Sequence, residues 1–283
     1  MKITVIIPTL DAGSSIRELL SRLNLQDTKP SEIIVIDSSS QDDTVNIAQS
    51  LGAKTIVIPR HTFNHGTTRN RAASEAGGDI LVFMTQDALP VDNTLLTKLT
   101  APLQVSDIAA TFGKQVPRTD ATPLEVFAKQ FNYPDTGAIK GTDDIKRYGI
   151  MTFRLSNVCS AIKKELFIKV GMFPEGVRAN EDMLISAQFI LNGYRVAYIP
   201  GAVVIHSHEY CLLKLFRRYY NIGSSLRTHK WILTYAEPEG EGIKFMKGQI
   251  RFVLRQRKYF WIPYIFLESI AKYAGYKFGL IAG

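Results

Sequence analysis

The sequence lacks the features that mark several classes of protein. Its 283 residues contain only two cysteines, Cys159 and Cys211, which form neither a disulfide framework nor a paired metal motif. No stretch offers the roughly 18 uninterrupted apolar residues of a membrane-spanning helix. The first eight residues are too short for a signal peptide and are typical of a strand. We therefore expect a protein of a reducing compartment, the cytoplasm.

Two common nucleotide motifs are also missing. The first predicted turn, residues 8–13, reads Pro-Thr-Leu-Asp-Ala-Gly in place of G-x-G-x-x-G, and no G-x-x-x-x-G-K-[ST] loop occurs. Both absences argue against dinucleotide cofactors and P-loop chemistry.

The net charge of +8 is unevenly distributed. Residues 1–205 carry 21 basic and 21 acidic side chains, whereas residues 206–283 carry 13 basic and 5 acidic ones. The pattern indicates a neutral body followed by a basic tail that faces an anionic surface.

Apolar runs alternate with helical patterns over the first hundred residues. Strands are predicted at 2–7, 33–36, 54–58 and 80–84, and helices at 14–25, 42–51 and 67–76. This alternation predicts an α/β fold with a doubly wound, mostly parallel sheet. Further on we expect strands at 108–116, 154–162, 194–199 and 202–206, helices at 123–131, 163–170, from about 180, 211–230 and 243–258, and a mobile loop at 132–149.

Polar side chains follow three of the early strands. Thr9, Asp37 and Asp87 each come directly after an apolar run. Because right-handed crossovers bring the carboxyl ends of parallel strands to one rim, we expect these residues to converge there. Asp87 alone is also explained as a cap of the helix that begins near Asp92.

Four ordered motifs carry a family resemblance: VIIPT at 5–9, IDSSSQDDT at 36–44, GDI through DA at 78–88, and Glu181-Asp182. Together they resemble the inverting glycosyltransferases of family 2, which have the GT-A fold, over residues 1–208. FNHGTTRN at 63–70 and TQDA at 85–88 look like bacterial rhamnosyltransferases that use dTDP-L-rhamnose. The resemblance implies a donor-binding half at 1–100, an acceptor and catalytic half at 101–208, and a basic, aromatic-rich helical extension at 209–283.

The resemblance also implies a pocket for a nucleotide-sugar donor. The side chains implied to line it are Pro8, Thr9, Asp11, Asp37, Asn64, His65, Arg69, Gln86 and Asp87. Asp37 is placed at the N3–H of a pyrimidine, which suits a carboxylate because it only accepts hydrogen bonds. Arg69 is placed at a phosphate, which a guanidinium pairs bidentately. The alternatives are a turn cap for Asp37 and an ordinary surface position for Arg69.

A divalent cation, Mg²⁺ or Mn²⁺, is implied at the diphosphate. Asp87 corresponds to the last acid of the family's D-x-D motif, and His206 to a histidine that completes the metal site. Thr85 stands where the motif has its first aspartate, so the strength of the metal dependence stays open. His206 is preferred to His208 as the ligand, and two ordinary surface histidines are the alternative.

Asp182 corresponds to the family's general base, which takes the proton of the attacking acceptor hydroxyl. Glu181 is implied to orient the acceptor or Asp182. The alternative for both acids is stabilisation of a helix N-terminus.

The tail combines basic residues with an aromatic run at 259–267 that is too short to span a bilayer. We expect it to lie on the inner face of the cell membrane, and a helical hairpin on the core or a contact in a homo-oligomer is the alternative. No recognised module supports nucleic-acid binding.

The sequence thus predicts an inverting rhamnosyltransferase of O-antigen or similar surface polysaccharide synthesis, acting on a lipid-linked glycan. Transfer of another sugar from a UDP donor, and a non-catalytic sugar-nucleotide-binding protein, are the alternatives.

Overall fold

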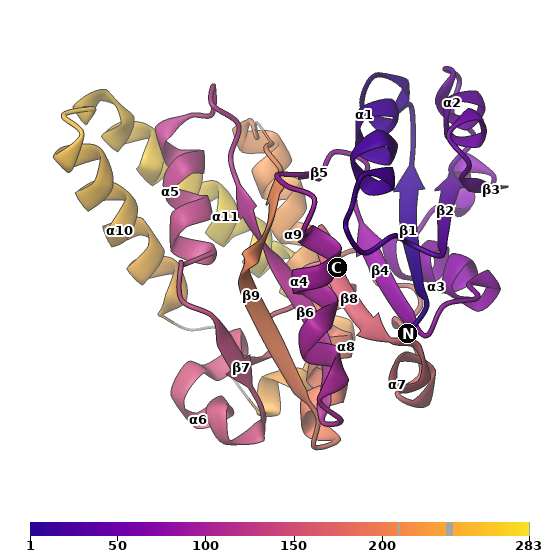
Figure 1. The fold of residues 1–283 in the computed structure, drawn as a ribbon. Helices are drawn as coiled ribbons and strands as arrows, with labels where there is room; N and C mark the ends of the chain where they lie inside the picture. The colour runs from indigo at the N-terminus through magenta and orange to yellow at the C-terminus, as the bar shows by residue number, and fades with distance from the viewer. Residues whose placement is uncertain (209, 236–239, 283) are drawn as a thin grey trace.

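A computed structural model describes residues 1–208, 210–235 and 240–282 (Figure 1). One sheet organises it, in the order β3-β2-β1-β4-β8-β6-β9-β5, with β7 beside β9. Its strands are β1 (Ile3–Thr9), β2 (Glu32–Asp37), β3 (Lys54–Val57), β4 (Ile80–Met84), β5 (Leu89–Pro90), β6 (Ile108–Val116), β7 (Ala138–Lys140), β8 (Cys159–Lys163) and β9 (Arg195–Ile205).

The sheet is mostly parallel, as predicted. β1, β2, β3, β4, β6 and β9 run in one direction, and β8 runs antiparallel between β4 and β6. The carboxyl ends of the parallel strands therefore share one edge with the residues that precede β8. This edge collects side chains from both halves of the chain.

Helices cover both faces of the sheet. They are α1 (Gly13–Asn24), α2 (Thr44–Ser50), α3 (His65–Glu75), α4 (Leu95–Thr100), α5 (Pro123–Asn132), α6 (Ile145–Tyr148), α7 (Lys164–Lys169), α8 (Glu181–Leu191), α9 (Leu212–Thr228), α10 (Glu241–Arg255) and α11 (Ile262–Ala282). On α1 the predicted apolar spacing holds, because Ile16, Leu19, Leu20 and Leu23 are all fully buried. One core packs α1, α2 and α4 on the sheet, and a second core packs α3, α7 and α8 on the opposite face.

Two predictions beyond residue 100 were wrong in detail. Residues 195–205 form one strand and not two, because a register shift opposite Gly113 and Lys114 of β6 accommodates Pro200. A bulge suits a residue that has no N–H to donate to the sheet. The segment predicted as a loop at 132–149 contains β7, paired with β9, and the short helix α6.

The C-terminal helices are packed onto the body. A small core joins α5 to α10 and α11 through Leu124, Val253 and Ile265. The aromatic run at 259–267 forms a 3₁₀ turn (Tyr259–Trp261) and the start of α11, which continues to Ala282. None of the described helices is long and apolar enough to cross a membrane. The division of the chain at residue 208 stays a prediction, and residue 209 lies outside the described residues.

Candidate active site

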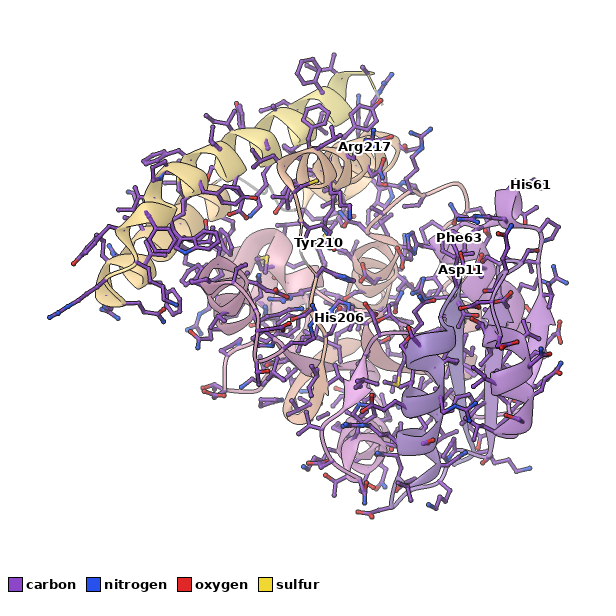
Figure 2. The ribbon with its side chains drawn as sticks, turned by 90° about the horizontal axis from the view of Figure 1, so that it is seen from above. Asp11, His61, Phe63, His206, Tyr210 and Arg217 are labelled. Atoms are coloured by element: carbon purple, nitrogen blue, oxygen red, sulfur yellow. The ribbon has the colours of Figure 1, made fainter. Side chains whose placement is uncertain are left out.

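Figure 2 looks down on the carboxyl edge of the sheet and labels Asp11 and His206, two of the predicted site residues. Asp11 follows β1, and His61 and Phe63 precede α3. His206 follows β9, Tyr210 lies just before α9, and Arg217 lies in α9. The edge thus brings together side chains from the start and the end of the chain.

Thr9, Asp37 and Ser40 form a buried hydrogen-bonded group at the ends of β1 and β2. The Asp37 carboxylate accepts from the Thr9 hydroxyl at 2.8 Å and from the Ser40 hydroxyl and backbone N–H at 2.5 and 2.8 Å. Asp37 is fully buried. Its carboxylate therefore organises the loop after β2, and the predicted contact with a pyrimidine base stays a prediction.

Asp11 extends this group toward the surface. Its backbone has a φ of +48°, and its N–H donates to the Ser40 hydroxyl at 2.8 Å. Its carboxylate accepts from the backbone N–H of Gln41 at 2.9 Å, and Arg60 lies 4.0 Å away. The loop from Pro8 to Asp11 is thereby fixed against the loop after β2.

Gln86 fixes the same loop from the other side. Its amide oxygen accepts from the Leu10 N–H at 2.8 Å, and its amide nitrogen donates to the Leu10 carbonyl at 3.1 Å. Both halves of the amide are thus engaged by one backbone unit, which joins the segment after β1 to the segment after β4. This contact positions Asp87 relative to Asp11, and the predicted donor contact of Gln86 stays a prediction.

Asn64 is the N-cap of α3. Its side-chain oxygen accepts from the backbone N–H groups of Gly66 and Thr67 at 3.0 and 3.2 Å, and its nitrogen donates to the Val177 carbonyl at 2.8 Å. Such a cap is worth about 1 kcal/mol. His65 begins the helix, and burial is the main cause that lowers its pKa. Because Asn64 occupies the N–H groups of Gly66 and Thr67, the attraction of this helix end for an anion rests on the positive end of the helix dipole.

A buried ion pair connects α3 to α8. The Arg69 Nη1 lies 3.4 Å from Glu181 and donates to the His65 carbonyl at 2.8 Å, while its Nε has no hydrogen-bond partner. The Asn157 amide donates to the same Glu181 oxygen at 3.2 Å. Removing one partner of a buried pair leaves the other charge uncompensated. Arg69, Glu181 and Asn157 therefore lock the donor side to the helix that carries Asp182.

Asp182 stands in the first turn of α8 beside Glu181. Its carboxylate accepts from the backbone N–H groups of Met183 and Asn157, at 2.8 and 3.3 Å. Removal from bulk water, and then the charge of Glu181, raise the pKa of Asp182 to about 7. A carboxylate with such a pKa accepts a proton far better than an ordinary aspartate does. The environment therefore suits a general base.

Asp87, His206 and His208 form a cluster whose candidate ligand atoms all lie within 4.8 Å of one another. The Nε2 atoms of His206 and His208 are 3.5 and 3.6 Å from the two Asp87 oxygens. The sequence preferred His206 to His208, whereas the structure brings both to Asp87. Their alternation in an extended segment was the signal that both rings point the same way.

The donor set of this cluster fits a divalent cation. The His206 Nε2 is buried and has no hydrogen-bond partner, as expected of a nitrogen reserved for a metal. Its Nδ1 lies 3.0 Å from the Gln115 amide oxygen and 3.2 Å from the Lys129 ammonium. Burial, and then the Lys129 charge, lower the pKa of His206 to about 2, so the ring is neutral and able to ligate.

The sequence missed three residues of this site: Gln115, Lys129 and Asn157. Gln115 and Lys129 orient His206, and a partner on the second nitrogen is the usual companion of a ligating histidine. Asn157 reaches the edge because it precedes the antiparallel strand β8. No local motif marks any of the three.

The sequence profile of Glycosyl transferase family 2 matches residues 4–171. The chain belongs to this family. It is 40% identical over 279 residues to the O-antigen chain rhamnosyltransferase WbaN of Salmonella anatum, covering 98% of this chain and 88% of the relative. It is also 40% identical to the O-antigen chain rhamnosyltransferase RfbN of Salmonella typhimurium, covering 99% of this chain and 90% of the relative.

Two solved structures share the fold. A mannosyltransferase from Pyrobaculum calidifontis, in complex with GDP-Man and Mn²⁺, has a TM-score of 0.63 at 17% identity, covering 96% of this chain and 87% of that one. TarS from S. aureus has a TM-score of 0.60 at 18% identity, covering 99% and 90%. These likenesses confirm the predicted GT-A fold, and the family confirms that the protein is a glycosyltransferase.

Proposed function

We propose that the protein transfers L-rhamnose from dTDP-L-rhamnose, with inversion, to a hydroxyl of a lipid-linked glycan in O-antigen synthesis at the inner face of the cell membrane. The observation that carries the proposal is the 40% identity to two O-antigen chain rhamnosyltransferases over nearly the whole chain. The arrangement of Asp182, the Asp87 cluster and the Thr9–Asp37 group supports it.

Residues 1–100 bind the donor in this proposal. The loop that carries Thr9 and Asp11 and the buried Asp37 hold the pyrimidine nucleoside. The N-terminus of α3, with His65, faces the diphosphate, and Arg69 contributes positive charge beside it. Asn64 and Gln86 act through the backbone that they fix, because their amides are engaged there.

Asp87, His206 and His208 hold Mg²⁺ or Mn²⁺ at the diphosphate. When bound, the cation neutralises charge on the leaving diphosphate. Gln115 accepts a hydrogen bond from Nδ1 of His206 in the tautomer that leaves Nε2 free to ligate. With a single carboxylate in the cluster, and Thr85 where the family has an aspartate, we expect weaker cation binding than in a site with two carboxylates.

Asp182 takes the proton of the attacking hydroxyl. Inversion requires that this hydroxyl approach the anomeric carbon from the face opposite the diphosphate. Glu181, held by Arg69 and Asn157, fixes the first turn of α8 and keeps the pKa of Asp182 high. A base with a pKa near 7 is half ionised at neutral pH, which balances availability against proton affinity.

The test measures transfer from dTDP-L-rhamnose, UDP-sugars and GDP-sugars to a synthetic glycan acceptor, with product configuration read by NMR. We expect turnover only with dTDP-L-rhamnose and an inverted linkage. Asp182→Asn should reduce turnover at least about a thousandfold while donor binding survives, and the exposed Asp27→Asn serves as the matched control. A preferred UDP-sugar would overturn the donor assignment, and full turnover by Asp182→Asn would overturn the base.

A further inference from the structure

The long C-terminal helix α11 has its polar and apolar faces reversed relative to a helix in water. Its inner side carries Glu268, which is buried, pairs with Lys272 and accepts from the Gln249 amide at 3.1 Å. Its outer side carries large apolar side chains with exposed fractions of 47–75%: Phe266, Leu267, Ile270, Tyr273, Phe278 and Ile281. A helix whose outer face meets only water shows the opposite distribution.

The outward side chains form one continuous stripe. With 3.6 residues per turn, positions 266, 267, 270, 273, 278 and 281 fall within an arc of about 140° around the axis of α11, so they lie on one side of the helix. Lys277 is the one exposed charged side chain between residues 262 and 282. Monomeric proteins rarely leave an apolar patch of this extent in water, which indicates that something covers it.

The stripe cannot turn inward. A Cβ on Gly275 would lie 2.3 Å from the Phe216 carbonyl oxygen, and one on Gly279 would lie 2.1 Å from the Tyr220 carbonyl oxygen. The backbones of α9 and α11 therefore touch, and only glycine permits this approach. Because the inner face is fixed in this way, the apolar face stays outward. In Figure 2, side chains of α11 project away from the rest of the chain.

The charges around the stripe decide what covers it. Residues 241–283 contain eight basic residues and two acidic ones, Glu241, which pairs with Lys244, and the buried Glu268. Lys244, Lys247 and Arg251 line a shallow hollow on α10. The exposed Arg255, Arg257 and Lys258 then lead into the exposed aromatic rings of Tyr259 and Phe260. A second copy of the chain would bring the same positive charge to the face, whereas an anionic phospholipid surface complements it.

We propose that α11 lies in the surface of an anionic phospholipid membrane, with its apolar stripe among the acyl chains and the basic residues of α10 and 255–258 at the headgroups. Interfacial helices combine a large apolar face with flanking cations in this way. The helix does not cross the bilayer in this arrangement, consistent with the absence of a spanning helix among the described residues.

Contacts connect this face to the candidate active site. Tyr264 of α11 donates to the Tyr210 carbonyl at 3.4 Å, and the Tyr210 ring lies 5.4 Å from the ring of His208. Arg218 of α9 donates to the Tyr210 hydroxyl at 3.2 Å. The site therefore lies close to the membrane-bound helix. A membrane at this face would also bring a lipid-linked acceptor close to the site. This step alone rests on the proposed function.

The test is flotation of the full-length protein with vesicles of phosphatidylcholine alone or with about 30% phosphatidylglycerol. The wild type should float with the anionic vesicles and bind less in high salt. Ile270→Gln with Tyr273→Gln should lower the partition coefficient about tenfold or more. Val57→Gln with Ile168→Gln, two equally exposed apolar positions on β3 and α7, should leave binding unchanged.

Two outcomes would overturn the proposal. One is equal flotation of the wild type and the α11 variant. The other is a wild type that is a dimer by light scattering and an α11 variant that is a monomer, because the stripe would then be a protein interface. Both variants should transfer sugar to a water-soluble acceptor as the wild type does. A wild type that transfers sugar from dTDP-L-rhamnose but does not bind anionic vesicles would refute this proposal and leave the proposed function standing. A wild type that binds the vesicles but transfers no sugar would do the reverse.

Discussion

Replacing Asp182 with asparagine should stabilise the protein at alkaline pH while it abolishes the proposed reaction. The folded environment raises the pKa of Asp182 from its ordinary 3.8 to about 7. For an acid, a pKa that is higher in the folded than in the unfolded protein means that ionisation lowers the free energy of unfolding. This cost is absent below pH 3.8, grows as the pH rises, and is complete above pH 7. Asparagine carries no charge and avoids it at every pH.

The magnitude follows from the two pKa values. Proton linkage gives a cost of ionising Asp182 of about 1.5 kcal/mol at pH 5 and about 4 kcal/mol at pH 8. The Asp182 carboxylate accepts from the backbone N–H groups of both Met183 and Asn157. An asparagine amide has one oxygen and keeps only one of these hydrogen bonds, and the loss costs about 1 kcal/mol. The variant should therefore gain about 3 kcal/mol at pH 8 and roughly 0.5 kcal/mol at pH 5.

Thermal unfolding followed by calorimetry or fluorescence at both pH values measures the effect. A gain of 3 kcal/mol corresponds to a rise in Tm of about 6 °C for a protein of this size. Asp27→Asn, an exposed aspartate, is the matched control and should change little at either pH. The raised pKa of Asp182 would be refuted if the Asp182→Asn protein melts no higher than the wild type at pH 8. An equal gain in Tm at pH 5 would refute it as well.

Three further predictions concern neighbouring residues. Glu181→Gln removes a negative charge that raises the pKa of Asp182, the proposed base. The rising limb of the pH–rate profile should therefore move to lower pH, and a limb that stays in place would contradict this. His208→Asn should weaken Mn²⁺ binding by about tenfold or more in calorimetry with dTDP present, while His61→Asn should not. Gln86→Met leaves the backbone N–H and carbonyl of Leu10 without their partners, so the free energy of unfolding should fall by about 2 kcal/mol and the donor KM should rise. A higher KM with an unchanged Tm would instead mean that Gln86 contacts the donor directly.

The donor half was predictable because its signals are local. Buried parallel strands are short continuous apolar runs, and each ends at a polar residue that the sequence displays next to it. The sequence alone therefore places Thr9, Asp37 and Asp87 on one edge. The convergence of Asp182 and His206 on that edge followed from the order of the family motifs and could not be derived from periodicity.

The second half was less predictable because its geometry depends on non-local pairing. Asn157 precedes a strand that runs against its neighbours, and nothing in the sequence marks that direction. The bulge in β9 depends on Gly113 of β6, where a Cβ would lie 2.5 Å from the Ala202 carbonyl. Gln115 and Lys129 reach His206 from β6 and α5, so their function appears only when these elements meet.

The same distinction between local and non-local signals applies to two of the predicted donor residues, Asn64 and Gln86. Asn64 and Gln86 stand within motifs of the family resemblance, yet their amide groups are engaged by backbone atoms of α3 and of Leu10. A motif records that a residue matters and does not distinguish contact with a ligand from the support of a loop that makes the contact. The hydrogen-bonding capacity of an amide makes the distinction, because a group with both ends engaged by backbone has little left for a ligand. By this criterion the Nε2 of His206, the Thr85 hydroxyl and the Arg69 Nε, all buried and without a hydrogen-bond partner, are the atoms of this edge that stay open to a ligand.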